Sequence, residues 1–209
     1  MDGSVAFRLA QHASAFQLKL ARLPQDTDPA RQGDGALRCL ALVTDPKARG
    51  RLVARLYPRL FGPWPSLARL DDRATRLALL DRDRLVSHLC RLALAARPGA
   101  LRCCIARDVR RALQASLGDA FDGLLRGGTG GRAIPETAAG WSPLHWACLG
   151  FLDWATLLQP EDKPLRRLVE ASLPPGLLGM PAACSTVPRE RSAAKAVEEL
   201  DRLSLEWSC

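Results

Sequence analysis

The chain has 209 residues, of which 47% are hydrophobic and 25% charged, and its formal net charge is +8. This composition excludes a disordered protein and predicts one domain with a hydrophobic core plus tails. Residues 1–11 lack the apolar segment of a signal peptide, and no later stretch approaches the roughly 18 consecutive apolar residues of a membrane span. We therefore expect a soluble protein that stays in the cytosol.

The cysteines and the positive charge each suggest a simple interpretation. Seven cysteines, several of them among apolar residues, predict reduced thiols that behave as small hydrophobic groups. The arginines are scattered through Ala- and Leu-rich segments beside acidic residues instead of forming runs. GC-rich coding explains most of this excess, and an acidic partner surface would also suit it. A basic helical nucleic-acid-binding protein is the alternative.

The first half of the chain predicts helices that are separated by turns rich in proline and glycine. Asp45 followed by Pro46 is a typical helix start, because Asp accepts an unpaired backbone amide and proline lacks a donor that would be idle there. Apolar residues recur at helical spacing on either side of this start. The expected helices are 5–23, 46–60 and 71–96, and the expected connections are a loop at 24–35 and a turn at 62–65.

The second half continues in the same way, with Asp108 and Ser142 as predicted N-caps. A linker rich in proline and glycine precedes the last amphipathic helix, in which Glu198 is placed to pair with Arg202. No strand pair stands out, so the fold class is all-α: an irregular single-domain helical bundle with a C-terminal amphipathic helix. The expected helices are 100–106, 108–124, 142–158, 164–173 and 189–207, and the expected parts are a helical domain 1–173, a linker 174–188 and a C-terminal helix 189–209.

Motifs that carry chemistry are weak or incomplete. Residues 140–148 resemble the opening of an ankyrin repeat, but no second copy lies one period away. His145 and Cys148 lack the paired ligand spacing of a structural zinc site. The glycine cluster 127–131 follows a helix and lacks the lysine of a phosphate-binding loop. No nucleophile, base and acid combine into a catalytic set, so we expect no enzyme, cofactor, metal or small-molecule substrate.

A resemblance to a known family adds a specific function. Leu89-Cys90-Arg91-Leu92 followed by residues 100–105, the early Phe16-Gln17-Leu18 and a tryptophan-bearing helix in the second half resemble the SctK family, also called YscK or PscK. The close part of the resemblance covers residues 85–117. The resemblance implies a non-enzymatic adaptor at the cytoplasmic face of the bacterial inner membrane, within the sorting platform of a type III secretion injectisome. Such an adaptor links the inner-membrane ring protein SctD to the pod protein SctQ, and indirectly to SctL and SctN.

Two groups of side chains are candidates for partner binding. Arg102, Arg107, Arg110 and Arg111 lie beside the family-like block and are predicted to dock an acidic surface of SctD. Leu200, Leu203 and Trp207 are predicted anchors of the C-terminal helix in a groove of SctQ or another platform protein. The alternative for this helix is packing on its own bundle.

Overall fold

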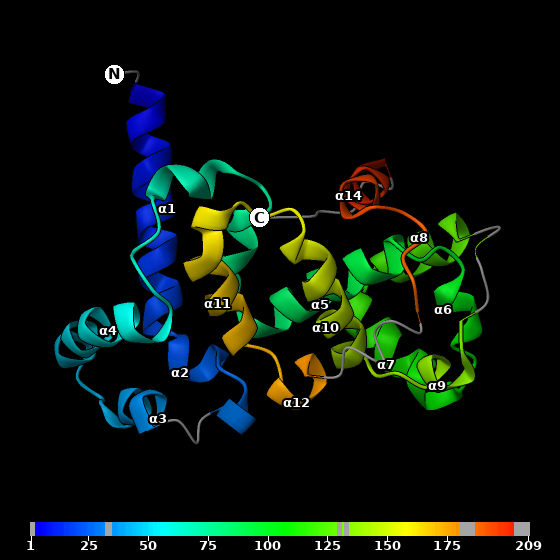
Figure 1. Ribbon diagram of the computed structural model, residues 1–209, viewed down its shortest axis with the longest axis horizontal. Coiled ribbons are helices and arrows are strands. Elements are labelled where there is room, and N and C mark those ends of the chain that lie inside the picture. The colour runs from blue at the N-terminus through cyan, green and yellow to red at the C-terminus, as the bar shows by residue number, and fades with distance from the viewer. Residues whose placement is uncertain (1–2, 32–34, 129–130, 132–133, 180–186, 203–209) are drawn as a thin grey trace. The chain divides into compact units, whose positions relative to one another are not determined.

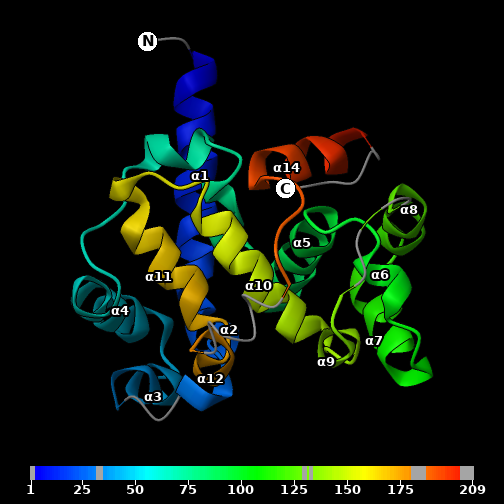
Figure 2. The ribbon, with the colours of Figure 1, turned by 45° about the vertical axis from the view of Figure 1, so that its right-hand side comes forward.

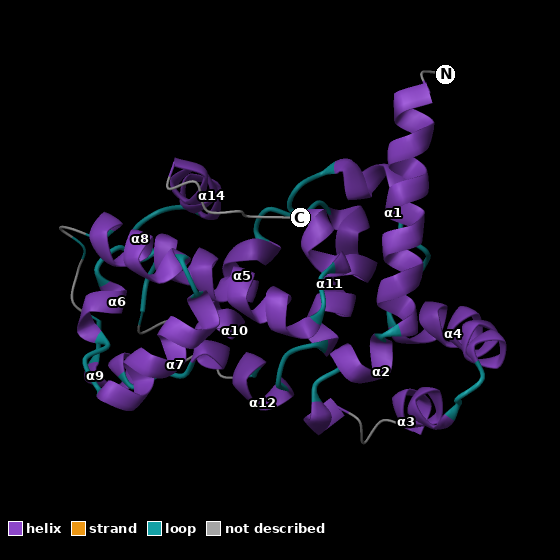
Figure 3. Ribbon diagram, turned by 180° about the vertical axis from the view of Figure 1, so that it is seen from behind, coloured by secondary structure: helices purple, strands orange, loops and turns teal. Residues whose placement is uncertain are grey.

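The computed structural model describes residues 3–31, 35–128, 131, 134–179 and 187–202. Every regular element within these ranges is helical, and Figure 3 shows no strand among them. The all-α prediction is therefore confirmed. The chain divides into two compact units, one formed by residues 1–85 and 158–175 and the other by residues 86–157 and 176–208.

Unit 1 is built around the long N-terminal helix α1, against which α4 and the 3₁₀ helix η2 pack, while α11 packs on η3 (Figure 1). Its interior is formed by aliphatic side chains together with Phe16, Tyr57 and Phe61, of which Tyr57 is 1% exposed. The elements are α1 (Gly3–Ala21), α2 (Leu23–Asp26), η1 (Pro29–Arg31), α3 (Gly35–Leu42), α4 (Pro46–Leu60), η2 (Leu67–Asp71), η3 (Thr75–Leu79), η4 (Pro160–Asp162) and α11 (Lys163–Ala171).

Helices α1, α4 and α11 confirm the sequence predictions for these segments. At the start of α4, the Asp45 carboxylate accepts a hydrogen bond of 2.7 Å from the Ala48 amide, and Pro46 occupies the first turn. The predicted cap therefore forms with the expected geometry.

The prediction of a loop over 24–35 is wrong in its first part. Pro24 stands in the first turn of α2, where its missing amide hydrogen costs nothing. Asp28 accepts from the Ala30 amide at 3.0 Å and so shapes the turn before η1. The following helix α3 was not predicted, and residues 32–34 lie outside the described part of the chain.

The long helix predicted from residue 71 to 96 is wrong before residue 82. Helix α5 begins only at Arg82, and two 3₁₀ helices precede it. The Asp72 carboxylate accepts from the Ala74 amide at 2.7 Å, and the Thr75 hydroxyl donates to the carbonyls of Asp72 and Arg69. These local bonds satisfy the backbone without an α-helix, and the apolar spacing still buries Leu77.

Unit 2 encloses Trp146 and Trp154, both without exposed surface, among leucines of its other helices. Residues of α5, α8 and α14 line one small cavity, and α14 lies near the end of α5 in Figure 2. The elements are α5 (Arg82–Ala95), whose first turn belongs to unit 1, α6 (Ala100–Cys103), α7 (Arg107–Leu117), α8 (Ala120–Gly127), α9 (Glu136–Ala139), α10 (Pro143–Ala155), α12 (Pro175–Leu178), which begins at the unit boundary, and α14 (Ala193–Arg202).

Helices α5 and α10 cross at very short range. A Cβ atom placed on Gly150 of α10 would lie 1.9 Å from the carbonyl oxygen of Leu89 in α5. Leu89 is fully buried, so the crossing lies in the core of unit 2. The glycine is therefore what allows the two backbones to meet.

The single helix predicted over 108–124 is two helices. Gly118 has a φ of 56°, a left-handed conformation that ends α7 before α8 begins. Asp108 is not the N-cap, because Ala106 holds that position and Asp108 lies in the first turn. A carboxylate there still faces the positive end of the helix dipole.

The helices predicted over 142–158 and 189–207 form with shifted ends. Helix α10 begins after Ser142 as predicted and ends at Ala155. Helix α14 begins only at Ala193, because the amides of Glu190 and Arg191 both donate to the Ala96 carbonyl, at 3.0 Å each. Arg202 pairs with Glu199 at 2.6 Å, and the predicted pairing with Glu198 is wrong.

Candidate protein-binding surfaces

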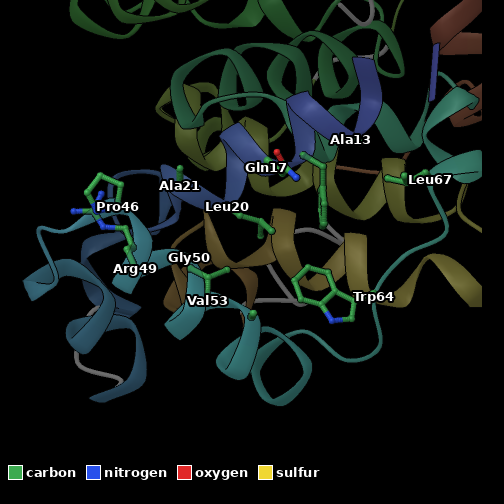
Figure 4. A pocket seen from close by; sticks show the side chains of 12 residues that line it. Ala13, Gln17, Leu20, Ala21, Pro46, Arg49, Gly50, Val53, Trp64 and Leu67 are labelled. Atoms are coloured by element: carbon green, nitrogen blue, oxygen red, sulfur yellow. The ribbon is translucent and has the colours of Figure 1, made fainter. Parts of the chain in front are cut away.

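An apolar groove lies between α1 and α4 in unit 1. Figure 4 shows side chains of α1, α4, Trp64 and Leu67 around it, and its volume is about 550 Å³. Gln17 and Arg49 are its polar members. The full lining is Ala13, Phe16, Gln17, Leu20, Ala21, Pro46, Arg49, Gly50, Val53, Ala54, Trp64 and Leu67.

Small residues and an aromatic cluster together create this groove. Gly50 and Ala54 give the α4 wall no bulky side chain to fill the space. Phe16 and Tyr57 meet edge to face at 5.8 Å, and Trp64 stacks on Tyr57 at 4.3 Å. Trp64 is nevertheless 48% exposed. The three rings therefore pack into one apolar wall of the groove, and the exposed part of Trp64 is still accessible to a binding partner.

Exposed apolar residues also occur on another side of α1. Phe7 and Leu18 are 65% and 59% exposed, and their spacing of eleven residues puts them on the same side of the helix. The charged residues of α1 are Arg8 and Lys19, and Lys19 is buried. An exposed helix with so little charge is unusual for a surface that meets only water.

A row of four cations runs along the exposed side of α4, and we call it the basic stripe: Lys47, Arg51, Arg55 and Arg59. A spacing of four residues aligns such side chains along one side of a helix. Among the described residues, none of the four has an ion-pair partner. The sequence has no acidic residue from position 46 to 70, so no carboxylate of α4 itself can neutralise the stripe.

A buried ion pair fixes the end of α1 that forms one groove wall. The Lys19 ammonium donates to Asp26 at 2.9 Å and to the Leu80 carbonyl at 2.6 Å. Burial lowers the pKa of Lys19, and the hydrogen bond that Lys19 donates to Asp26 opposes this shift. Asp28 pairs with Arg82 at 2.7 Å close by. Because these charges are partnered, α1 is held in a defined place relative to the start of α5.

A second pair holds η2, which contributes Leu67 to the groove. The Arg69 guanidinium donates to both carboxylate oxygens of Asp162, at 2.9 and 2.7 Å. Burial acts to raise the pKa of Asp162, but the Arg69 bond and a bond from the Gln159 amide together lower it. The fork geometry makes this a rigid link between η2 and η4.

The structure divides the four candidate arginines of unit 2 into two kinds. Arg102 donates to the Leu125 carbonyl at 3.2 Å, and the Arg110 guanidinium stands 5.4 Å from the centre of the Phe121 ring. Arg107 and Arg111 are exposed on one side of α7 and have no ion-pair partner among the described residues. These two are therefore free to meet a partner, while the other two also hold helices α6, α7 and α8 together.

The three predicted anchors of the C-terminal helix have different positions. Leu200 has no exposed surface and packs inside unit 2, as the alternative of packing on its own bundle expects. Leu203 and Trp207 lie outside the described residues. A partner-binding role for this helix stays a prediction.

The segment before α14 is tied to unit 2 by a buried ionic cluster. Arg97 pairs with Asp153 at 2.6 Å and donates to the Val187 carbonyl at 2.9 Å. Arg189 approaches the same carboxylate at 3.3 Å. Burial raises the pKa of Asp153, and the bonds from Arg97 act against it. The chain that follows the predicted linker is thus anchored at Val187.

Neither a metal-binding cluster nor a membrane-spanning helix is found in the described part of the chain. No group of three or more His, Cys, Asp or Glu side chains there could hold a metal ion. Within the same ranges, no helix is long and apolar enough to cross a membrane.

Sequence reasoning missed the groove and the basic stripe. The arginines of α4 counted as dispersed along the chain, and only their spacing of four within a capped helix could have indicated a single row. The groove depends on the distance between two helices, which the sequence of either helix does not contain.

Comparison with known families identifies the chain. No curated protein and no solved structure matches it. Residues 6–203 match the family described as bacterial type III secretion protein (HrpB4), which agrees with the type III secretion resemblance noted in the sequence. Because this match spans nearly the whole chain, the protein belongs to the HrpB4 family of bacterial type III secretion proteins.

Proposed function

We propose that this protein is a non-enzymatic adaptor of the type III secretion injectisome that links the inner-membrane ring protein SctD to the pod protein SctQ. It acts at the cytoplasmic face of the bacterial inner membrane, which it reaches through protein contacts. SctL and SctN connect to it indirectly through SctQ. The observation that carries the proposal is the family match over residues 6–203.

The surfaces of the two units support an adaptor role. Unit 1 carries the groove and the basic stripe, and unit 2 carries Arg107 and Arg111. An adaptor needs at least two binding surfaces, and cations without internal carboxylate partners suit acidic protein surfaces. We assign Arg107 and Arg111 to the contact with SctD.

The test is charge reversal in unit 2. The variant R107E/R111E is expected to lose co-purification with the SctD cytoplasmic domain and to abolish secretion of a type III substrate. Arg110 is left unchanged because its contact with Phe121 supports the fold. The matched control is R126E/K195E, which makes the same charge change at two other exposed positions of the same unit.

Two results would count against the proposal. Normal SctD recovery and secretion by R107E/R111E would remove α7 as the ring-binding surface. Unchanged secretion by a strain that lacks the protein altogether would reject the adaptor role itself.

A further inference from the structure

We infer that the groove between α1 and α4 binds an acidic amphipathic helix of a protein partner, with the partner's carboxylates against the basic stripe. This inference deepens the proposed function, on which it rests only in taking the natural partner to be a component of the secretion apparatus. It concerns unit 1 and is independent of the arginines of α7.

The shape and lining of the groove fit one face of a helix. Two turns of an α-helix with side chains occupy roughly 1,000 Å³. The groove holds about 550 Å³, so it accepts the apolar side chains of one face but not a whole helix. Helices dock in such grooves through anchors at positions i, i+3 or i+4, and i+7.

The basic stripe of α4 determines which residues of the partner helix should lie beside its apolar anchors. Lys47 and Arg51 alternate along α4 with the groove residues Gly50 and Ala54, so the apolar and basic sides of this helix adjoin. A docked helix with Glu or Asp beside its apolar face would place these carboxylates next to the stripe. Each exposed pair contributes little to affinity, but a row of them fixes orientation and speeds association.

The same features disfavour a phosphate-bearing partner. Binding to a nucleic-acid backbone requires cations but no apolar groove beside them. Insertion into an anionic membrane requires apolar side chains that protrude. Phe7 and Leu18 protrude, but on another side of α1. The groove beside the stripe is recessed, with Val53 and Leu20 only 5% and 8% exposed, although its lining residue Trp64 is 48% exposed. A recessed apolar lining next to a basic row is therefore best matched by a folded amphipathic segment.

The probe is a fluorescein-labelled synthetic peptide of roughly 18 residues, long enough to form a helix, with Leu anchors flanked by Glu. A sister peptide carries Lys at every Glu position. Fluorescence anisotropy with the full-length protein is expected to show binding of the acidic peptide, and binding at least roughly tenfold weaker for the sister peptide. Neither peptide derives from the secretion apparatus. The peptide assay can therefore fail while the adaptor role holds, and the adaptor role can fail while the peptide binds.

Three variants locate the site. K47E/R51E is expected to lower the affinity for the acidic peptide at least roughly tenfold and to raise the affinity for the Lys peptide. G50W fills the groove and is expected to abolish binding of the acidic peptide, and a Cβ at this exposed position meets no atom within 4 Å. The control R126E/K195E in unit 2 is expected to change nothing. Circular dichroism verifies that each variant is folded.

Several outcomes would overturn the inference. Absence of acidic-peptide binding would remove the groove as a helix site. Equal losses of affinity for the acidic peptide in K47E/R51E and in the control would show that binding depends on the net charge of the protein and not on the position of the stripe. Tighter binding of anionic phospholipid vesicles or duplex DNA than of the peptide, with the same dependence on Lys47 and Arg51, would assign the stripe to a phosphate-bearing partner.

Discussion

Replacing Gly150 with alanine tests the close crossing of α5 and α10. The added Cβ would lie 1.9 Å from the Leu89 carbonyl oxygen and 2.6 Å from its carbon, whereas ordinary contacts begin at 3.4 Å. The obstacle is backbone, which cannot turn away as a side chain does. The two helices must therefore separate in the core of unit 2.

Two opposing terms set the expected size of the effect. Overpacking a core costs typically 1–3 kcal/mol, and a collision with backbone belongs at the upper end, about 3 kcal/mol. Alanine is favoured over glycine inside a helix by about 1 kcal/mol. We expect a net destabilisation of about 2 kcal/mol, which lowers Tm by roughly 4–8 °C for a chain of this size.

Urea unfolding followed by circular dichroism, and by tryptophan fluorescence, to which the buried Trp146 and Trp154 of unit 2 contribute, measures this change. Gly50→Ala in α4 is the matched control, because its Cβ would meet nothing within 4 Å. The control is expected to stabilise the protein by roughly 0.5–1 kcal/mol. If both substitutions stabilise the protein equally, the reasoning from the α5–α10 crossing is refuted.

Three further predictions concern buried groups. Asp153→Asn leaves the Arg97 charge buried without its carboxylate and is expected to cost about 3–5 kcal/mol in urea unfolding; a loss below about 1 kcal/mol would show that the ion pair is not buried as described. The lowered pKa of Asp162 stabilises the fold above the unfolded value of about 3.9, and this contribution is lost as pH falls through the folded pKa. The stability difference between wild type and Asp162→Asn should therefore be constant above about pH 5 and shrink as the pH falls below about 4, and a difference that stays constant there would contradict the assignment. Exposed Cys39 should react with maleimide at once, whereas burial raises the pKa of Cys90 and should delay its reaction until unfolding, as mass spectrometry can follow.

The sequence predicted the helical class and several helix starts because these depend on local chemistry. The Asp45 cap and the Pro143 start formed as expected, since each needs only neighbouring backbone. The predicted helix over 71–96 failed because apolar spacing also fits a buried 3₁₀ segment, and Asp72 and Thr75 supply competing hydrogen bonds.

The surfaces were less accessible to prediction than the helices. Arg107 and Arg111 were identified from their place beside a family-like block, and the structure finds both exposed. The groove requires α1, α4 and η2 to come together, and the groups that fix α1 and η2 are distant in sequence: the Leu80 carbonyl for Lys19 and the Asp162 carboxylate for Arg69. Leu200 could not be assigned from the sequence for another reason. The apolar spacing of an amphipathic helix is the same whether its apolar side packs on its own chain or on a partner.

The division of the chain has a consequence for mapping experiments. Unit 1 needs residues 158–175 as well as 1–85, and α5 passes from one unit into the other without a break. No single cut therefore yields an intact half. A fragment ending near residue 85 would lack α11 and expose the leucines that α11 covers, such as Leu77. Two-hybrid or pull-down screens with such fragments would detect nonspecific binding to an exposed hydrophobic core. Binding surfaces of this protein are therefore better mapped by point substitution in the full-length chain.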